Sequence, residues 1–214
     1  MTIDLAHPES QPISSRRNPL AKARSVARPT IVERLKLETA AEHAAIEGAT
    51  GVLAPELELR EYRAYLERTF AFYLVVQQQL RDWEAWEALG LPATERDQLP
   101  LLAEDLVLLG NLEPASIRAC DAPPDFTSTA AAVGGAYVLE GSTLGGRVIS
   151  RHIQRLFGPD VARAFLDGYG ADTGEQWQTF RAALANFASS REVEDQIVAG
   201  AQETFRAFTR WLKR

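Results

Sequence analysis

Lys36, His43 and Glu47 are spaced so that they share one stripe of a helix. A neutral ring nitrogen of His43 could ligate a metal ion or a heme iron. Glu47, one turn further on, could accept a hydrogen bond from the other ring nitrogen and so fix the tautomer. Lys36 precedes His43 by two turns, about 10 Å along the axis, a suitable distance for a cation at the rim of a flat macrocycle. The alternative is a histidine in a solvent-facing stripe of Glu and Lys.

A second stretch is rich in glycine yet reads as one long helix. Gly134, Gly135, Gly141, Gly145 and Gly146 lie within it, and no proline interrupts it. Each interior glycine costs a helix about 0.5–1 kcal/mol relative to alanine, so the run needs a reason. The last three glycines would let the backbone approach the second face of a tetrapyrrole. The spacing of Gly141 and Gly145 equally permits close packing against another helix.

Other reactive side chains give weaker signals. His152 suits a surface or capping role, and the arginines at 147, 151 and 155 form a row typical of a solvated helix face. Cys120 has no neighbouring histidine and does not read as a nucleophile. As the single cysteine it excludes an internal disulfide, which favours a reducing compartment, most simply the cytoplasm.

Composition and length narrow the class of protein. The 214 residues suit one domain, and 46% hydrophobic with 24% charged residues is ordinary for a globular protein. A net charge of −6 gives no reason to expect nucleic acid as a partner. Glu140 interrupts the longest apolar run, so no membrane span is expected.

These residues must be positioned by helices, because helical spacing dominates and no alternating strand or hairpin signal appears. Residues 1–28 are basic and rich in proline, and we expect a disordered tail there. The domain predicted over 29–214 is all-α. A capping box of Thr30 and Glu33 starts its first helix. The expected helices are 31–47, ending at Gly48, then 59–83, 100–110, 127–157 and 160–167, followed by two more towards the C-terminus.

Two motifs resemble those of the heme oxygenases, most closely the short bacterial type that supplies bilins to phytochromes. Leu35-Lys36-x6-His43-x3-Glu47 is similar to the proximal helix of that family. Tyr137-x3-Gly141-Ser-Thr-Leu-Gly145-Gly146 is similar to its kinked distal helix. Arg181 matches an arginine that pairs with a heme propionate. The resemblance covers residues 29–214 and implies a single-domain helical bundle with heme between the two helices.

The resemblance also implies an activity. Heme would be both substrate and cofactor, converted to biliverdin, carbon monoxide and ferrous iron with dioxygen and reductant. His43 would hold the iron, Glu47 would orient the imidazole, and Lys36, Tyr137 and Arg181 would contact the heme. Electrons would come from a ferredoxin or a flavin reductase, and a bacteriophytochrome could receive the biliverdin.

On the other face, the resemblance implies that dioxygen binds against the backbone from Gly141 to Gly146. Gly141, Ser142, Gly145 and Gly146 are therefore the expected catalytic segment, with ordered water as the proton donor. Animal members carry an aspartate where this chain has Ser142, which is uncharged and a weaker acceptor. The same fold could instead serve as a non-catalytic heme carrier or sensor. A helical interaction protein unrelated to heme, whose glycines serve packing, is a third hypothesis.

Overall fold

The computed structural model describes residues 28–110, 113 and 116–214, and within these ranges it contains helices, turns and loops but no strand. The all-α prediction is confirmed. Of the predicted tail, only Arg28 falls within the described residues. The helices are α1 (Ile31–Glu38), α2 (Ala40–Thr50), α3 (Leu59–Asp82), α4 (Ala85–Ala88), η1 (Ala93–Arg96), α5 (Leu99–Leu108), α6 (Thr129–Phe157), α7 (Ala164–Asp167), η3 (Gly170–Asp172), α8 (Thr173–Phe187) and α9 (Arg191–Leu212).

The glycine-rich helix α6 packs against α9 with backbone touching backbone. A Cβ built on Gly134 would overlap the carbonyl oxygen of Ile197, and one built on Gly200 would overlap the carbonyl oxygen of Ala131. Only glycine allows two helix axes to approach this closely. Gly135 leaves room for the ring of Phe126, whose Cζ would lie 2.5 Å from a Cβ. The first two glycines of the run therefore serve helix packing.

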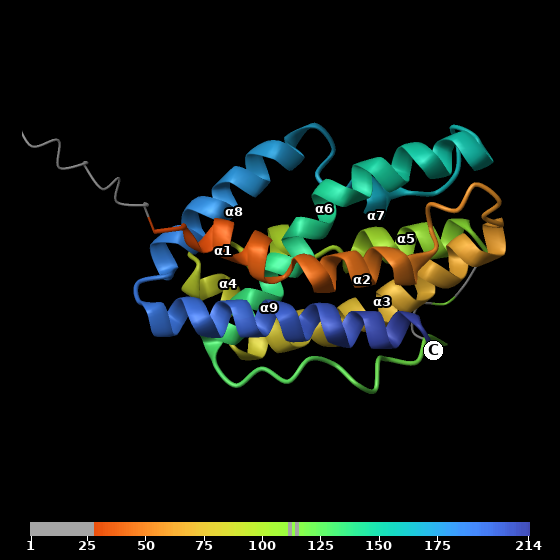
Figure 1. Ribbon diagram of the computed structural model, residues 1–214. Helices are drawn as coiled ribbons and strands as arrows, with labels where there is room; N and C mark the ends of the chain where they lie inside the picture. Colours follow the sequence, from red (N-terminus) through yellow and green to blue (C-terminus); the bar gives the residue numbers. More distant parts are fainter. Residues whose placement is uncertain (1–27, 111–112, 114–115) are drawn as a thin grey trace, which may run out of the picture.

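Farther along, α6 changes direction, and its second half lies above α2 (Figure 1). The change follows a cluster of residues that weaken or bend helices. Ser142 donates a hydrogen bond of 2.6 Å to the carbonyl oxygen of Leu139, and Thr143 donates one of 2.7 Å to that of Glu140. Such back-bonding tends to bend a helix, and Gly141 offers no side chain to resist it.

The helix predicted over 31–47 is two helices, so that prediction is wrong in its extent. Thr30 and Glu33 form the predicted capping box at the start of α1. The chain leaves regular helical geometry at Thr39, whose hydroxyl donates to the carbonyl oxygen of Leu35 at 2.7 Å. The second helix then runs on past Gly48 to Gly51, which has a φ of 62° and ends it. Figure 1 shows α1 and α2 almost end to end, with α9 alongside them.

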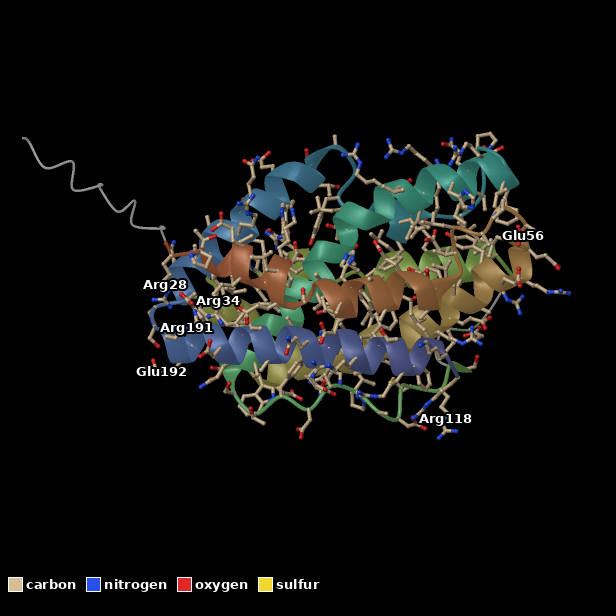
Figure 2. The ribbon with its side chains drawn as sticks, in the orientation of Figure 1. Arg28, Arg34, Glu56, Arg118, Arg191 and Glu192 are labelled. Carbon is tan, nitrogen blue, oxygen red and sulfur yellow. The ribbon has the colours of Figure 1, made fainter. Side chains whose placement is uncertain are left out.

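A cluster of charged side chains fixes the beginning of α1 against the beginning of α9. Arg34 is 3% exposed and donates to Glu194 at 2.7 Å and to Asp195 at 2.6 Å. Arg28 adds a hydrogen bond of 2.9 Å to Glu194. Figure 2 shows Arg28, Arg34 and Arg191 gathered at this end of the molecule. The cluster holds α1 in place, and α1 in turn sets where α2 starts.

Among the helices of the described ranges, none combines the length and the apolar character that a membrane span requires.

Candidate functional site

A cavity of about 330 Å³ opens between α2 and the bent part of α6. This volume is within the range of small-molecule sites. Helices α3, α7, α8 and α9 complete its walls, and most of the lining is apolar or aromatic. The lining residues are His43, Ile46, Glu47, Thr50, Tyr65, Thr69, Tyr73, Tyr137, Val138, Leu139, Gly141, Ser142, Thr143, Leu144, Gly145, Gly146, Ile149, Phe165, Leu166, Trp177, Phe205 and Phe208.

His43 lies on the α2 wall, with its side chain 58% exposed. Its Nδ1 is 3.5 Å from Oε1 of Glu47, which is longer than an ordinary N–H···O hydrogen bond. The ring is held edge-on to Phe205, with centroids 5.7 Å apart. Because Nδ1 faces the carboxylate, Nε2 is the nitrogen left for a ligand. The imidazole is thus held on one side and open on the other.

The α6 wall contains the last three glycines, and they differ in what surrounds them. A Cβ on Gly145 would meet no protein atom within 4 Å, and one on Gly141 would only reach Cη2 of Trp177 at 4.0 Å. A Cβ on Gly146 would lie 2.6 Å from the carbonyl oxygen of Leu166 in α7. Gly141 and Gly145 therefore keep the cavity wall bare, whereas the missing side chain of Gly146 also serves the packing of α7.

The Ser and Thr hydroxyls of the cavity all point their protons away from it. Each donates to a carbonyl oxygen of its own helix at 2.6–3.0 Å: Thr50 to Glu47, Thr69 to Tyr65, Ser142 to Leu139 and Thr143 to Glu140. The lone pairs of these hydroxyl oxygens therefore face the cavity. These hydroxyls consequently offer acceptors, which can hold water as the donor.

Tyr73 contributes one further hydroxyl, 2.8 Å from Oγ of Ser142. Because the only proton of Ser142 is committed to Leu139, the shared proton must belong to Tyr73. The Tyr73 ring packs edge-on against Phe165, with centroids 5.4 Å apart. Burial raises the pKa of Tyr73, so it keeps its proton at neutral pH. The two hydroxyls form a directed pair on the wall opposite His43.

Of the remaining predicted site residues, one lines the cavity and two lie outside it. Tyr137 lines the cavity, where its ring lies 5.8 Å from that of Trp177. Lys36 and Arg181 are exposed and do not line it. Arg181 lies near Glu33, whose pKa is lowered chiefly by the backbone hydrogen bond from Thr30 and only slightly by this arginine. The structure therefore brings Tyr137 to the cavity wall and leaves the two cations outside it.

Sequence reasoning missed several residues of the site. Tyr73 belongs to the core-facing line of α3, and nothing in that pattern separates a core tyrosine from one that faces a cavity. Trp177 and Phe205 are likewise spaced as core aromatics. His152, which suited a capping role, lies 3.0 Å from the carbonyl oxygen of Ala54 through its Nε2 and does not line the cavity. A signal for Tyr73 would have required knowing that α3 faces Ser142.

Comparison with known proteins identifies the family of this chain. The family model described as "Heme oxygenase" matches residues 30–214. A curated heme oxygenase of Xanthomonas campestris pv. campestris is 34% identical over 148 residues, which cover 69% of this chain and 86% of that protein.

Two solved structures have the same fold. The heme oxygenase from Neisseria meningitidis, solved with NO and CO bound, has a TM-score of 0.73 at 23% identity and covers 87% of this chain and 92% of its own. Heme oxygenase-1 from the cyanobacterium Synechocystis, in complex with heme, has a TM-score of 0.72 at 16% identity, with coverage of 86% and 91%.

Proposed function

The chain belongs to the heme oxygenase family, and we propose that His43 is the side chain that ligates the iron of its heme. As a heme oxygenase the protein degrades heme to biliverdin, carbon monoxide and ferrous iron, using dioxygen and reductant. Heme is its substrate, and while bound it supplies both the iron that activates dioxygen and the ring that is opened. Family membership favours this enzyme over a non-catalytic carrier or sensor.

One observation supports the assignment of His43 most directly: the imidazole and a bare backbone segment line the same cavity. The α2 wall offers the free Nε2, and the α6 wall offers Gly141 and Gly145 without side chains. A flat macrocycle needs a ligand on one face and room on the other, and apolar contacts around its edge. The residues present fit a heme on all three counts.

For the opposite face we propose that Tyr73 and Ser142 order a water molecule. Their donated protons run from Tyr73 to Ser142 to Leu139, so the pair presents lone pairs to the cavity. A water that donates one proton to these lone pairs keeps its other proton free to point at the substrate. In this arrangement the uncharged Ser142 needs Tyr73 as its partner, and no strong acid or base is required there.

Glu47, Lys36 and Arg181 complete the proposed heme contacts. Glu47 would shorten its 3.5 Å approach to Nδ1 when iron polarises the imidazole. Lys36 and Arg181 are exposed, long and flexible, so each could reach a propionate at the open rim of the cavity. Their contribution would be modest, because solvent screens exposed ion pairs.

We further propose an acidic electron donor, either a ferredoxin or a flavin reductase. Arg147, Arg151 and Arg155 are exposed along α6 and form no ion pair within the described residues. An exposed row of positive charge that begins directly after Gly146 of the cavity wall would steer a negative partner, and the rate of reduction should therefore fall as salt rises. The buried free thiol of Cys120 supports a cytoplasmic location. Transfer of biliverdin to a bacteriophytochrome stays a prediction from the sequence.

The test of the iron ligand is a titration of the purified protein with hemin. The native protein should develop a Soret band of fixed stoichiometry, and His43→Ala should weaken or abolish it. His152→Ala is the matched control, because His152 lies outside the cavity on α6. Added imidazole should restore the spectrum of His43→Ala. An unchanged spectrum in that variant would remove His43 as the ligand.

A further inference from the structure

A buried charge cluster lies directly behind the α6 wall of the cavity. Arg96 and Glu140 are 2% and 3% exposed, and Nη1 of Arg96 donates to Oε2 of Glu140 at 2.9 Å. The hydroxyl of Tyr169 donates to the other carboxylate oxygen at 2.7 Å. Nη2 of Arg96 donates to Oε1 of Gln176 at 2.8 Å. Both Nη atoms of Arg96 and both carboxylate oxygens of Glu140 thus have directed hydrogen bonds, whereas Nε of Arg96 is buried without a partner among the described residues.

These bonds join elements that are far apart in the sequence. Arg96 ends η1, Glu140 lies in α6, Tyr169 precedes η3, and Gln176 lies in the first turns of α8. A fourth bond, from Nε2 of Gln77 in α3 to the carbonyl oxygen of Arg96, measures 3.1 Å. The guanidinium also lies over the Tyr169 ring, 5.6 Å from its centroid. One arginine therefore ties α6 and α8 to the rest of the bundle.

The cluster does not line the cavity, but its neighbours do. Leu139 and Gly141 flank Glu140 and are part of the α6 wall, while Trp177 follows Gln176 and is the α8 contribution to the lining. The Trp177 ring lies 4.0 Å from the site of a Cβ on Gly141. Any shift of Glu140 relative to Gln176 would consequently change the width of the cavity where Gly141 faces Trp177.

A contribution to the stability of the fold does not by itself explain why a charged pair is buried here. The cost of removing two charges from water offsets most of their attraction, and apolar side chains of similar size commonly stabilise a fold as well or better. Burial raises the pKa of Glu140, whereas the hydrogen bond from Tyr169 and the charge of Arg96 act to lower it. The cost of desolvating the carboxylate therefore exceeds what these two partners return. What directed hydrogen bonds add over apolar contacts is a defined relative position of the groups they join.

We propose that Arg96 and Glu140 are positioning residues that set the seat of heme between α6 and Trp177, and thereby which meso carbon of the ring is attacked. The inference rests on the proposed heme site. Heme seated in a cavity of defined width has one preferred rotation about its iron. A cavity that relaxes at Gly141 would admit a second rotation, which exposes a different ring edge to the same distal groups.

The test replaces the pair by apolar residues, in Arg96→Met/Glu140→Leu. This variant should fold, as judged by an unchanged far-ultraviolet spectrum and a cooperative urea transition, and it should still bind hemin. Its bilin products, separated by chromatography, should contain a second isomer, with the isomer ratio changed about tenfold, equivalent to about 1.4 kcal/mol of discrimination. The circular dichroism of the bound heme, which requires no turnover, should change as well.

Gln176→Leu is a second variant that leaves the buried pair intact and cuts only its link to α8. Because Gln176 is half-buried, this change should not endanger folding, and it should shift both readouts in the same direction by a smaller amount. The matched control is Gln178→Leu, an exposed site on the same helix. Wild-type isomer ratio and heme dichroism in both the double variant and Gln176→Leu would overturn the proposal. Loss of hemin binding in His43→Ala tests the proposed iron ligand separately.

Discussion

The adjacent glycines Gly145 and Gly146 should respond in opposite ways to the same substitution. Both lie in the interior of α6, where alanine is favoured over glycine by about 0.5–1 kcal/mol. A Cβ on Gly145 would meet no protein atom within 4 Å, so Gly145→Ala should raise the free energy of unfolding by this full amount. Because 1 kcal/mol shifts the Tm of a chain of this size by about 2–4 °C, the heme-free variant should melt about 1–4 °C higher.

Gly146→Ala gives the same stabilisation of the helix but adds a steric clash with α7. Its Cβ would lie 2.6 Å from the carbonyl oxygen of Leu166, so α7 must move. Overpacking of this kind costs about 1–3 kcal/mol, which leaves a net loss of up to about 2.5 kcal/mol and about 1 kcal/mol at the middle of the two ranges. At that middle value the Tm of the heme-free variant should fall by about 2–4 °C.

The affinity for hemin should also distinguish Gly145 from Gly146. The added methyl of Gly145→Ala occupies the cavity wall, and a misfit of about 1–3 kcal/mol should weaken hemin binding by a factor of roughly 5 to 150. The assay is thermal unfolding of the heme-free proteins followed by hemin titration monitored in the Soret band. If Gly145→Ala were as destabilised as Gly146→Ala, or bound hemin normally, the assignment of Gly145 to the heme face would be refuted.

Three further outcomes are expected. Arg34→Met should lower the free energy of unfolding in urea by about 3 kcal/mol, the lower end of the cost of breaking a buried ion pair, because Glu194 keeps other arginines nearby. The pKa of Asp195 is lowered from 3.8, chiefly by the hydrogen bond from Arg34, so its stabilisation is present above pH 3.8 and is lost as pH falls through the lower folded pKa. When the urea midpoint is plotted against pH, Asp195→Asn should therefore flatten the acidic side of the curve. Hemin at a thousandfold excess over its Kd should stabilise the native protein by about 4 kcal/mol and stabilise His43→Ala far less.

Most of the fold could be predicted from spacing alone, since each long helix has an apolar stripe. The pattern over residues 59–83 indicates α3 almost to the residue. The break at Thr39 could not be predicted, because the stripe continues through it and threonine is tolerated inside helices. Thr39 is buried and its hydroxyl donates to the carbonyl oxygen of Leu35, but Thr69 makes the same bond to Tyr65 inside the unbroken α3, so this bond does not by itself set the break.

The part of the site that depends on neighbours along one helix could be predicted from the sequence. His43 and Glu47 are local neighbours on one helix, so their spacing carries the information. The roles of the five glycines depend on what faces each of them, and the sequence gives the same small residue for every case. Gly134 faces α9, Gly145 faces the cavity, and Gly146 faces α7. Only the packed structure divides a single motif into helix contacts and a bare wall.

Helix α2 shows why a ligand belongs in the cavity. None of its residues is buried, although it contains Ile46 and five alanines, and its packing partner is α9. A helix of three turns is marginal in water by itself and normally depends on burying one face. The face with His43, Ile46 and Thr50 is one that α9 leaves uncovered, and it lines the cavity. Heme bound against that face would bury it and supply the missing contact, so α2 should be the segment whose amide exchange slows most when hemin binds. Equal protection of α2 with and without hemin would place the heme elsewhere.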